Sequence, residues 1–174
     1  MKVITTDTGP LIHIEEVHAT RAWNIFQMVY IPDVVTDEIT ISKRPGNQTL
    51  RKSIFKESIT NRDTRDISGS IRNDHRISTN DSLILAHAIQ NRSHILLTDD
   101  LQLRTICNIK GIKPVGSAGI LYLSFLRGIF EIEELFQILD DLYSVSSLYI
   151  TREIIDQIRS EAIKDQRRKK SVLD

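Results

Sequence analysis

The chain has 174 residues, which is enough for one domain with a sizeable hydrophobic core. Its 23 Lys and Arg residues balance its 23 Asp and Glu residues, so the overall charge predicts no polyanionic partner. The single cysteine excludes an internal disulfide, and the longest mostly apolar stretch, residues 119–126, is much shorter than the ~20 residues of a membrane span. We therefore expect a soluble, cytoplasmic protein with no signal peptide and no membrane contact.

The predicted elements alternate between strands and helices. The first is a strand over residues 3–6, which ends at Asp7 and leads into a helix over residues 10–17, where Pro10 suits the first turn. The later elements are expected to be, in order, a helix over 19–27, a strand over 28–31, helices over 33–40 and 48–59, a helix beginning at 79, a strand over 94–98, a helix over 99–109, an edge-like strand over 112–115 and three C-terminal helices. This alternation predicts an α/β fold, an α/β/α sandwich with a central parallel sheet.

The middle of the chain is polar, and no pattern assigns residues 59–78 to a helix or a strand, so a mobile flap is one interpretation. Basic residues gather here, namely Lys43, Arg44, Arg51, Lys52, Lys56, Arg62, Arg65, Arg72 and Arg76. They could hold a phosphate backbone or simply form a solvated face, and the sequence favours neither interpretation. The basic end, residues 167–170, is expected to be a disordered, solubilising tail.

Carboxylates occur at four places where predicted strands end or helices begin. They are Asp7, the Asp37–Glu38 pair, Asp81, and the Asp99–Asp100 pair. Each could serve only as a helix cap or as a favourable charge in a first helical turn. In open α/β sheets, however, the crevice at the carboxyl ends of the strands is where ligands bind. We therefore expect these acids to converge on one site.

Helix geometry chooses between the two neighbouring acids of the second place. At about 100° per residue, Val34, Val35 and Ile39 define the inward side of the predicted helix. Glu38 projects with these apolar residues, whereas Asp37 falls outside them, towards solvent. Glu38 is therefore the better candidate for the site.

Carboxylates gathered without Lys or Arg partners repel one another, which raises some of their pKa values unless cations bind. A set of ligands made only of oxygen suits hard ions such as Mg²⁺ or Mn²⁺. Such an ion can orient a water, lower its pKa and stabilise charge on a phosphodiester. The chemistry that this pattern predicts is phosphodiester hydrolysis.

Two other chemistries have little support. The five histidines lack the spacing of a zinc site, and the lone Cys107 has no partner cysteine. The triplet Asp7-Thr8-Gly9 also matches an aspartic-protease signature, but the helical sequence after Pro10 does not fit the β-rich frame that such a site needs.

The segments around the acids resemble those of the PIN-domain ribonucleases. Four motifs carry the resemblance, in the family's order and approximate spacing over about residues 1–126: ITTDTGPLI (Ile4 to Ile12), IPDVVTDEI (Ile31 to Ile39), NDSLILAHA (Asn80 to Ala88) and ILLTDDLQLR (Ile95 to Arg104). The C-terminal helices resemble those of stand-alone prokaryotic PIN proteins that are longer than the compact VapC-type toxins. In one departure from the family, Thr8-Gly9-Pro10 replaces the commoner small hydroxyl pair, which removes one possible ligand.

The resemblance implies a PIN-like nuclease domain in residues 1–130, with residues 131–174 forming a helical extension packed on the same domain. It also implies a set of acidic ligands for Mg²⁺ or Mn²⁺, one auxiliary catalytic acid, and two hydroxyls that line the site. In this sequence the ligands would be Asp7, Glu38, Asp81 and Asp100, the auxiliary acid Asp99, and the hydroxyls those of Thr8 and Thr98.

The function expected from the resemblance is metal-dependent endoribonuclease activity on single-stranded RNA. Such a protein could be a VapC-type toxin with an antitoxin protein as its partner, or an RNA-processing nuclease. The rival interpretation is a PIN-like module that no longer cleaves and instead binds RNA or a protein partner. The apolar segment Ile120–Leu126 further suggests a homodimer.

Overall fold

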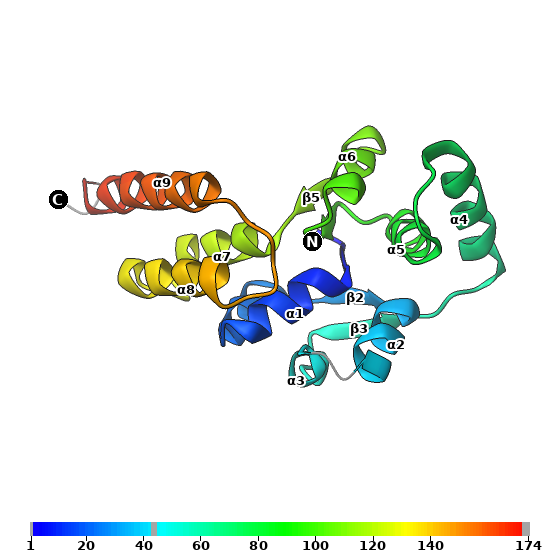
Figure 1. Ribbon diagram of the computed structural model, residues 1–174, viewed down its shortest axis with the longest axis horizontal. Helices are drawn as coiled ribbons and strands as arrows, with labels where there is room; N and C mark the ends of the chain where they lie inside the picture. Colours follow the sequence, from blue (N-terminus) through cyan, green and yellow to red (C-terminus); the bar gives the residue numbers. More distant parts are fainter. Residues whose placement is uncertain (1, 43–44, 172–174) are drawn as a thin grey trace.

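The computed structural model describes residues 2–42 and 45–171 of the chain (Figure 1). Within these ranges, five strands form one parallel sheet in the order β3-β2-β1-β4-β5. The strands are β1 (Ile4–Thr6), β2 (Val29–Pro32), β3 (Phe55–Ser58), β4 (Ile95–Leu97) and β5 (Lys113–Val115). The chain builds outward from β1 to β3 and then returns to place β4 on the other side of β1. The strand order therefore reverses between β1 and β4, where open sheets bind ligands.

Helices cover both faces of this sheet (Figure 1), so the predicted α/β fold with C-terminal helices is confirmed. On one face α5 contacts β1, β2 and β4, and α6 packs beside α5. The helices α1, η1 and α7 pack against one another. The helices are α1 (Thr8–Glu16), the 3₁₀ helix η1 (Thr20–Ile25), α2 (Asp33–Ser42), α3 (Asn47–Leu50), α4 (Arg62–His75), α5 (Thr79–Gln90), α6 (Leu101–Ile109), α7 (Ser117–Leu126), α8 (Ile132–Ser144) and α9 (Arg152–Ser171).

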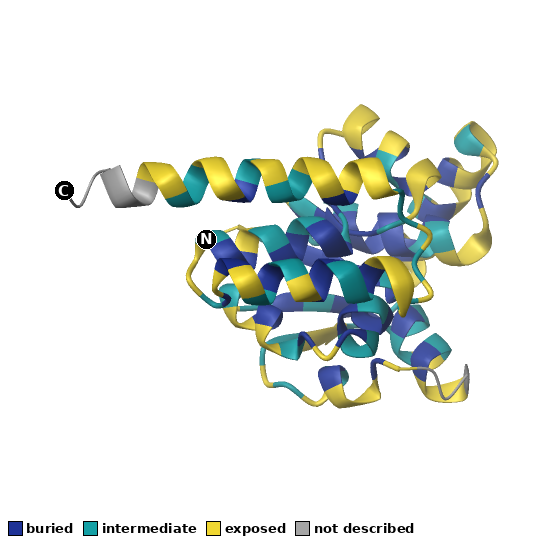
Figure 2. Cartoon of the chain, turned by 60° about the vertical axis from the view of Figure 1, so that its left-hand side comes forward, coloured by how far each residue is buried: buried dark blue, intermediate teal, exposed yellow. Residues whose placement is uncertain are grey.

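The hydrophobic core lies between the sheet and these helices (Figure 2). All three residues of β1 are buried, as is typical of a central parallel strand covered on both faces. Trp23 of η1 is fully buried and meets the ring of Phe55 edge-on, at 5.2 Å between ring centroids. The edge strand β3 is thereby anchored to the core.

Two predicted helices are corrected by the structure. The segment predicted as a helix over 19–27 is the shorter 3₁₀ helix η1, and the helix predicted over 48–59 is the single turn α3 followed by the strand β3. The strand has no alternating pattern because it lies at the sheet edge, with Lys56 and Glu57 exposed. It forms because it pairs in parallel with β2 and because Phe55 packs on Trp23. Both contacts come from distant parts of the chain, so local propensity does not reveal them.

Most of the segment 59–78 is the helix α4, rather than the mobile flap that its polar sequence suggested. Asn61 caps the helix in a reciprocal capping box with Thr64. The buried side of α4 packs on α5 through hydroxyl groups, with 2.7 Å between the oxygens of Ser68 and Ser82. Ile71 is also buried, and Ile67 packs against the core, but these are the two apolar residues of a mostly polar helix, so hydrophobic periodicity did not identify it.

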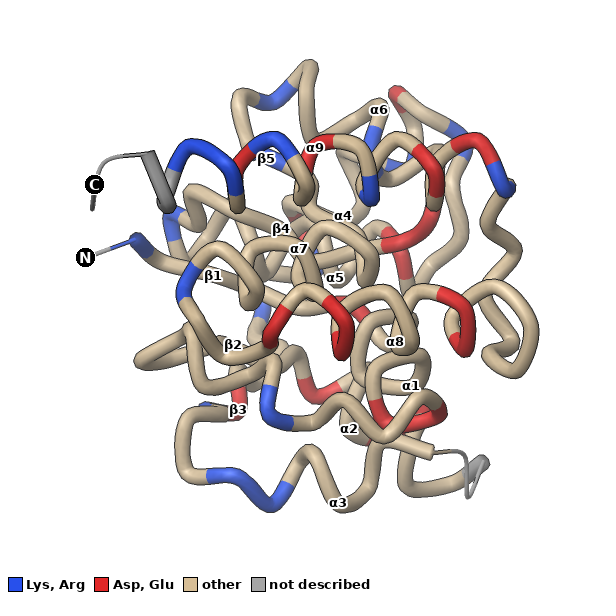
Figure 3. The backbone as a smooth tube through the Cα atoms, turned by 90° about the vertical axis from the view of Figure 1, so that its left-hand side faces the viewer, with Lys and Arg blue, Asp and Glu red and all other residues tan. Residues whose placement is uncertain are grey.

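The C-terminal helices α8 and α9 pack on α7 and on each other. The α7 segment that suggested a homodimer is largely covered within the chain: Ile120 and Leu121 are fully buried, and Leu123 is 37% exposed. The helix α9 continues to Ser171, so residues 167–170 are helical rather than disordered, and basic residues occupy its last turns (Figure 3). In the part of the chain that the structure describes, no helix is long and apolar enough to cross a membrane.

Candidate active site

The first and last acids of the predicted set meet because β1 and β4 are neighbours in register, with Thr6 paired to Leu97. Asp7 follows β1 and caps α1, accepting the Thr8 backbone N–H at 2.5 Å. Asp100 follows β4 and caps α6, accepting the Leu103 N–H at 2.6 Å. Each acid therefore fills the helix-capping role that its position suggests, and each also lies at the β1–β4 switch point.

The buried hydroxyl of Thr98 joins these two acids. Its oxygen donates a hydrogen bond to the Asp7 carboxylate at 2.8 Å and accepts one from the Asp100 backbone N–H at 3.2 Å. Because Thr98 is fully buried, its side chain has little freedom to turn away. The hydroxyl therefore fixes the orientation of Asp7 against the end of β4.

Two helices supply the other two acids. Glu38 of α2 accepts a hydrogen bond from the Thr8 hydroxyl at 2.9 Å, whereas its neighbour Asp37 is exposed. Asp81 lies in the first turn of α5, where it accepts from the hydroxyl of the capping Ser78 at 2.6 Å. The structure thus turns Glu38 towards the start of α1, while Asp37 faces solvent.

All four acids line one hollow of about 650 Å³, here called the acidic cavity. Its lining residues are Asp7, Thr8, Gly9, Ile12, His13, Glu16, Glu38, Pro45, Asp81, Asp100 and Ser147. Among these described residues there are five carboxylates and neither Lys nor Arg. Of the basic stretch 43–76, only Pro45 contributes to the lining, while Lys43 and Arg44 lie outside the described residues.

Asp7 lies in an environment that disfavours its charged form. Burial, together with the nearby charges of Asp81 and Asp99, raises the pKa of Asp7 from 3.8 to about 6. The hydrogen bonds from Thr98 and Thr8 lower this pKa but do not outweigh the burial. A buried carboxylate beside others of its kind is costly for the fold, and such costs are typical of functional sites.

Asp99 points elsewhere and is not part of the acidic cavity's lining. Its carboxylate accepts hydrogen bonds from the Ser117 backbone N–H at 2.7 Å and hydroxyl at 2.5 Å, and it lies 2.8 Å from Nδ1 of His13. A Cβ atom at Gly116 would lie 2.7 Å from this carboxylate, so only glycine allows the approach. Through these contacts Asp99 joins the end of β4 to the start of α7.

Glu16 and Ser147 also line the acidic cavity, although the sequence patterns did not single them out. Glu16 accepts the Ser147 backbone N–H at 2.8 Å, which ties α1 to the connection between α8 and α9. Gly9, His13 and Glu16 recur at helical spacing along α1, so helical periodicity could have placed Glu16 on the face of α1 that lines the cavity. Ser147 had no such signal, because it reaches the cavity only through the fold.

The donor chemistry fits a hard divalent cation, since every charged group lining the acidic cavity is a carboxylate. The carboxylates, however, lie farther apart than the ligands of one ion do. Among the described residues, no group of three or more His, Cys, Asp or Glu side chains is close enough to hold one ion. Each acid of the set is instead held by a local donor. Metal binding therefore requires some of these carboxylates to turn from their present partners.

The fold and the cavity define an α/β domain with a carboxylate-lined site at the switch point of a parallel sheet. A family model described as a PIN domain matches residues 3–164, and the chain belongs to the PIN-domain family. PIN domains are generally nucleases that typically use divalent metals and bind RNA, and this is the class of activity that the family indicates. Among curated proteins, none matches the chain.

Proposed function

We propose that the protein is a Mg²⁺- or Mn²⁺-dependent endoribonuclease that hydrolyses phosphodiester bonds of single-stranded RNA. One observation carries the proposal: Asp7, Glu38, Asp81 and Asp100 come from four separate segments and line one cavity at the β1–β4 switch point. Carboxylates gathered in this way repel one another, and a divalent cation relieves that repulsion. Membership of the PIN family supports the nuclease chemistry.

The four acids would be the metal ligands, and bound Mg²⁺ or Mn²⁺ supplies a water of lowered pKa together with positive charge for the phosphodiester. The neighbouring hydroxyls orient these ligands: Thr98 holds Asp7, and Thr8 holds Glu38. Asp99 would not bind the metal itself. It contacts His13 and the start of α7 and so positions both next to the cavity. Hydrogen-bonded partners of this kind commonly set the geometry of metal ligands.

A second candidate is a PIN-like module that binds RNA or a protein without cleaving RNA. The spacing of the carboxylates favours it, since no three of the described acidic or histidine side chains are close enough to share an ion. The complete set of four acids around one cavity favours the nuclease. The two candidates differ in one measurable property, which is metal-dependent cleavage.

The deciding experiment incubates purified protein with single-stranded RNA and Mn²⁺, with and without a chelator, beside Asp7→Asn. We expect cleavage by the wild type that stops with the chelator and is lost in the variant. Equal cleavage by both proteins would identify a contaminating nuclease and remove the support for this site. RNA binding without any cleavage by the wild type would establish the binding module instead.

A toxin restrained by an antitoxin and an RNA-processing nuclease would use the same chemistry. The site does not distinguish these roles, so the antitoxin partner stays a prediction, as does the homodimer. A small open reading frame next to the gene would favour the toxin, and its product should then suppress the RNA cleavage measured above.

A further inference from the structure

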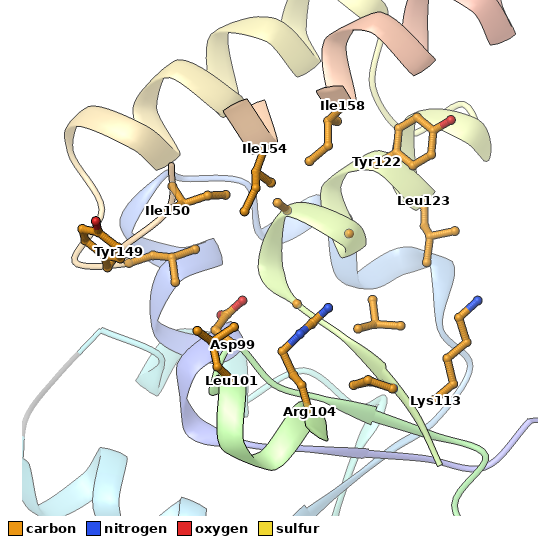
Figure 4. A pocket seen from close by; sticks show the side chains of 16 residues that line it. Asp99, Leu101, Arg104, Lys113, Tyr122, Leu123, Tyr149, Ile150, Ile154 and Ile158 are labelled. Carbon is orange, nitrogen blue, oxygen red and sulfur yellow. The ribbon is translucent and has the colours of Figure 1, made fainter. Parts of the chain in front are cut away.

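A groove of about 540 Å³ lies beside the acidic cavity, between α6 and β5 on one side and α7 and the start of α9 on the other (Figure 4). The two hollows meet at consecutive residues. Asp99 lines the groove and Asp100 the acidic cavity; likewise Leu148 lines the groove and Ser147 the cavity. The two hollows are therefore neighbours, with Asp99 and its partners His13 and Ser117 at their boundary.

The groove is cationic where the cavity is acidic. Arg104 and Lys113 both line it (Figure 4), and neither forms an ion pair with a carboxylate among the described residues. Arg104 donates only to a neutral group, the Thr98 carbonyl, at 3.2 Å. The one carboxylate of the groove, Asp99, is already held by Ser117 and His13. Arg104 and Lys113 thus bring two positive charges to a groove whose one described carboxylate is Asp99.

The positive charges continue beyond the groove. Lys113, Val115 and Leu123 also line a second hollow of about 460 Å³, which extends towards the amino ends of the strands. Lys2 and Arg127 add two more cations there, and no carboxylate is among the described residues that line it. The groove and this second hollow share Lys113 and together present four cations, which is the kind of charge that a polyanionic strand requires.

Exposed apolar side chains lie beside these charges. Tyr149 is 93% exposed and Leu101 79% exposed at the mouth of the groove, and Ile154 of α9 lies above it at 45% exposed (Figure 4). Unstacked bases pack on aromatic and apolar side chains, whereas their phosphates need cations. The groove offers both kinds of group side by side.

We propose that this groove holds the single-stranded RNA as it leaves the acidic cavity, with phosphates on Arg104 and Lys113 and a base stacked on Tyr149. The position of the strand rests on the proposed nuclease function, because the cavity is taken as the place of cleavage. A protein partner would also bury the apolar residues. RNA is favoured by the cations that line the two hollows and by the position of the groove next to the acidic cavity.

The first test measures RNA affinity by fluorescence anisotropy, with a labelled oligouridylate of about twelve nucleotides. The parent is the full-length Asp7→Asn protein, which leaves the RNA intact, at constant Mg²⁺. We expect Lys113→Glu to weaken binding roughly tenfold and to reduce the slope of log K against log salt by about 0.7, the value for one lost phosphate contact. Lys110→Glu is the matched control, since Lys110 is exposed three residues away and lines neither hollow.

The second test removes the stacking platform. Tyr149→Ala should weaken binding of the same oligouridylate roughly tenfold, with little change in the salt slope. Tyr143→Ala is its control, because Tyr143 is 43% exposed, stacks on Arg152 and lies outside the groove. Both tyrosines are at the surface, so thermal melting should show all of these variants to be folded.

The outcomes separate this inference from the proposed function. If wild type cleaves RNA while Lys113→Glu and Tyr149→Ala bind it as tightly as the parent, the groove is not the RNA path, and the nuclease proposal stands. If both variants lose affinity but wild type never cleaves, the groove binds RNA, and the nuclease proposal fails. Absence of RNA binding by the parent overturns the inference. So does a change from dimer to monomer in sedimentation with RNA affinity unchanged, since the groove would then be a protein interface.

Discussion

At the scale of single residues, three of the four acids are held by a side-chain hydroxyl next to them. Thr98 donates to Asp7, Thr8 donates to Glu38, and Ser78 donates to Asp81. Such short contacts restrict the carboxylates more than water would. In Asp7 the Thr98 hydroxyl holds one oxygen and the Thr8 backbone N–H holds the other. The threonines and serines near the acids are therefore part of the site, although none of them carries charge.

Glu38 and Asp37 form a natural pair for testing the site, since they are adjacent acids on one helix. We expect Glu38→Gln to lower the rate of RNA cleavage roughly a hundredfold, because it removes a charged ligand from the acidic cavity. Asp37→Asn should leave the rate unchanged, because Asp37 is exposed. Initial rates with single-stranded RNA and Mn²⁺ measure both. An equal loss of cleavage rate in the two variants would show that the charge of α2, rather than a ligand in the acidic cavity, determines the rate.

Asp7→Asn should stabilise the metal-free protein at neutral pH. Burial and the neighbouring carboxylates raise the pKa of Asp7 to about 6, so its ionised form opposes folding above that pH. The rise of about two pKa units corresponds to roughly 3 kcal/mol at neutral pH, so removing the charge should raise the Tm by about 6–12 °C for a chain of this size. Thermal melting in the presence of a chelator measures the change. A lower Tm would mean that the hydrogen bonds from Thr98 and Thr8 outweigh the repulsion.

At the scale of elements, one polar network ties together the two helices that carry Glu38 and Asp81. His87 of α5 is fully buried, with its ring nitrogens 2.9 Å from the Ser58 hydroxyl and 3.0 Å from the Thr60 hydroxyl. Thr60 in turn donates from its backbone N–H and its hydroxyl to Asp33, the first residue of α2. The end of β3 therefore joins α2 to α5, and the missed edge strand helps to set the spacing of the acidic cavity.

This network predicts a loss of stability in acid. Burial lowers the pKa of His87 below 6.5. As the pH falls, His87 therefore binds a proton more readily in the unfolded chain than in the folded protein. For Asp33 burial acts in the other direction, but the hydrogen bonds from Thr60 and Val34 outweigh it and lower its pKa below 3.8. Stability should therefore fall below about pH 6.5 through His87, and again below about pH 4 through Asp33.

The difference in unfolding free energy between wild type and His87→Gln isolates the first of these effects, because the opposite contribution of Asp7 is common to both proteins. Urea unfolding from about pH 7 to about pH 5 measures it. We expect the wild type to lose more stability over this range than the variant does. Parallel curves would show that His87 accepts a proton in the folded protein as readily as in the unfolded chain.

At the scale of the whole molecule, a neutral chain of 23 basic and 23 acidic residues separates its charges in space. The acidic cavity has no described Lys or Arg in its lining, whereas the hollows along β5 hold four cations and one carboxylate. The cavity alone would repel a phosphate backbone. In the proposed function, metal in the cavity and cations in the groove would together attract the RNA backbone.

Metal should therefore stabilise the whole domain through the acidic cavity. At a hundred times its Kd, Mn²⁺ should add about 2.7 kcal/mol, which corresponds to a rise of roughly 5–10 °C in the Tm of the wild type. The Tm of Glu38→Gln should rise much less, and that of Asp37→Asn as much as in the wild type. Thermal melting with and without a chelator measures all three. An equal rise in wild type and Glu38→Gln would place the metal elsewhere.

Several features of this protein could be predicted from its sequence because they depend on neighbours along the chain. The alternation of buried strands and helices indicated the parallel α/β sandwich, and the acids at strand ends indicated where a site would form. Helical periodicity within α2 separated Glu38 from Asp37, since the angle between adjacent residues is fixed by the helix itself.

Other features were decided only by the tertiary structure, because they depend on contacts between distant segments. The strand β3 forms through pairing with β2, and α4 packs on α5 partly through the Ser68 and Ser82 hydroxyls, which carry no hydropathy signal. Ser147 reaches the acidic cavity from the connection before α9, and Asp99 turns to the start of α7 while Asp100 faces the cavity. Local sequence placed an acid pair at the end of β4, but only the packing of α7 against that strand end decided the direction in which each acid points.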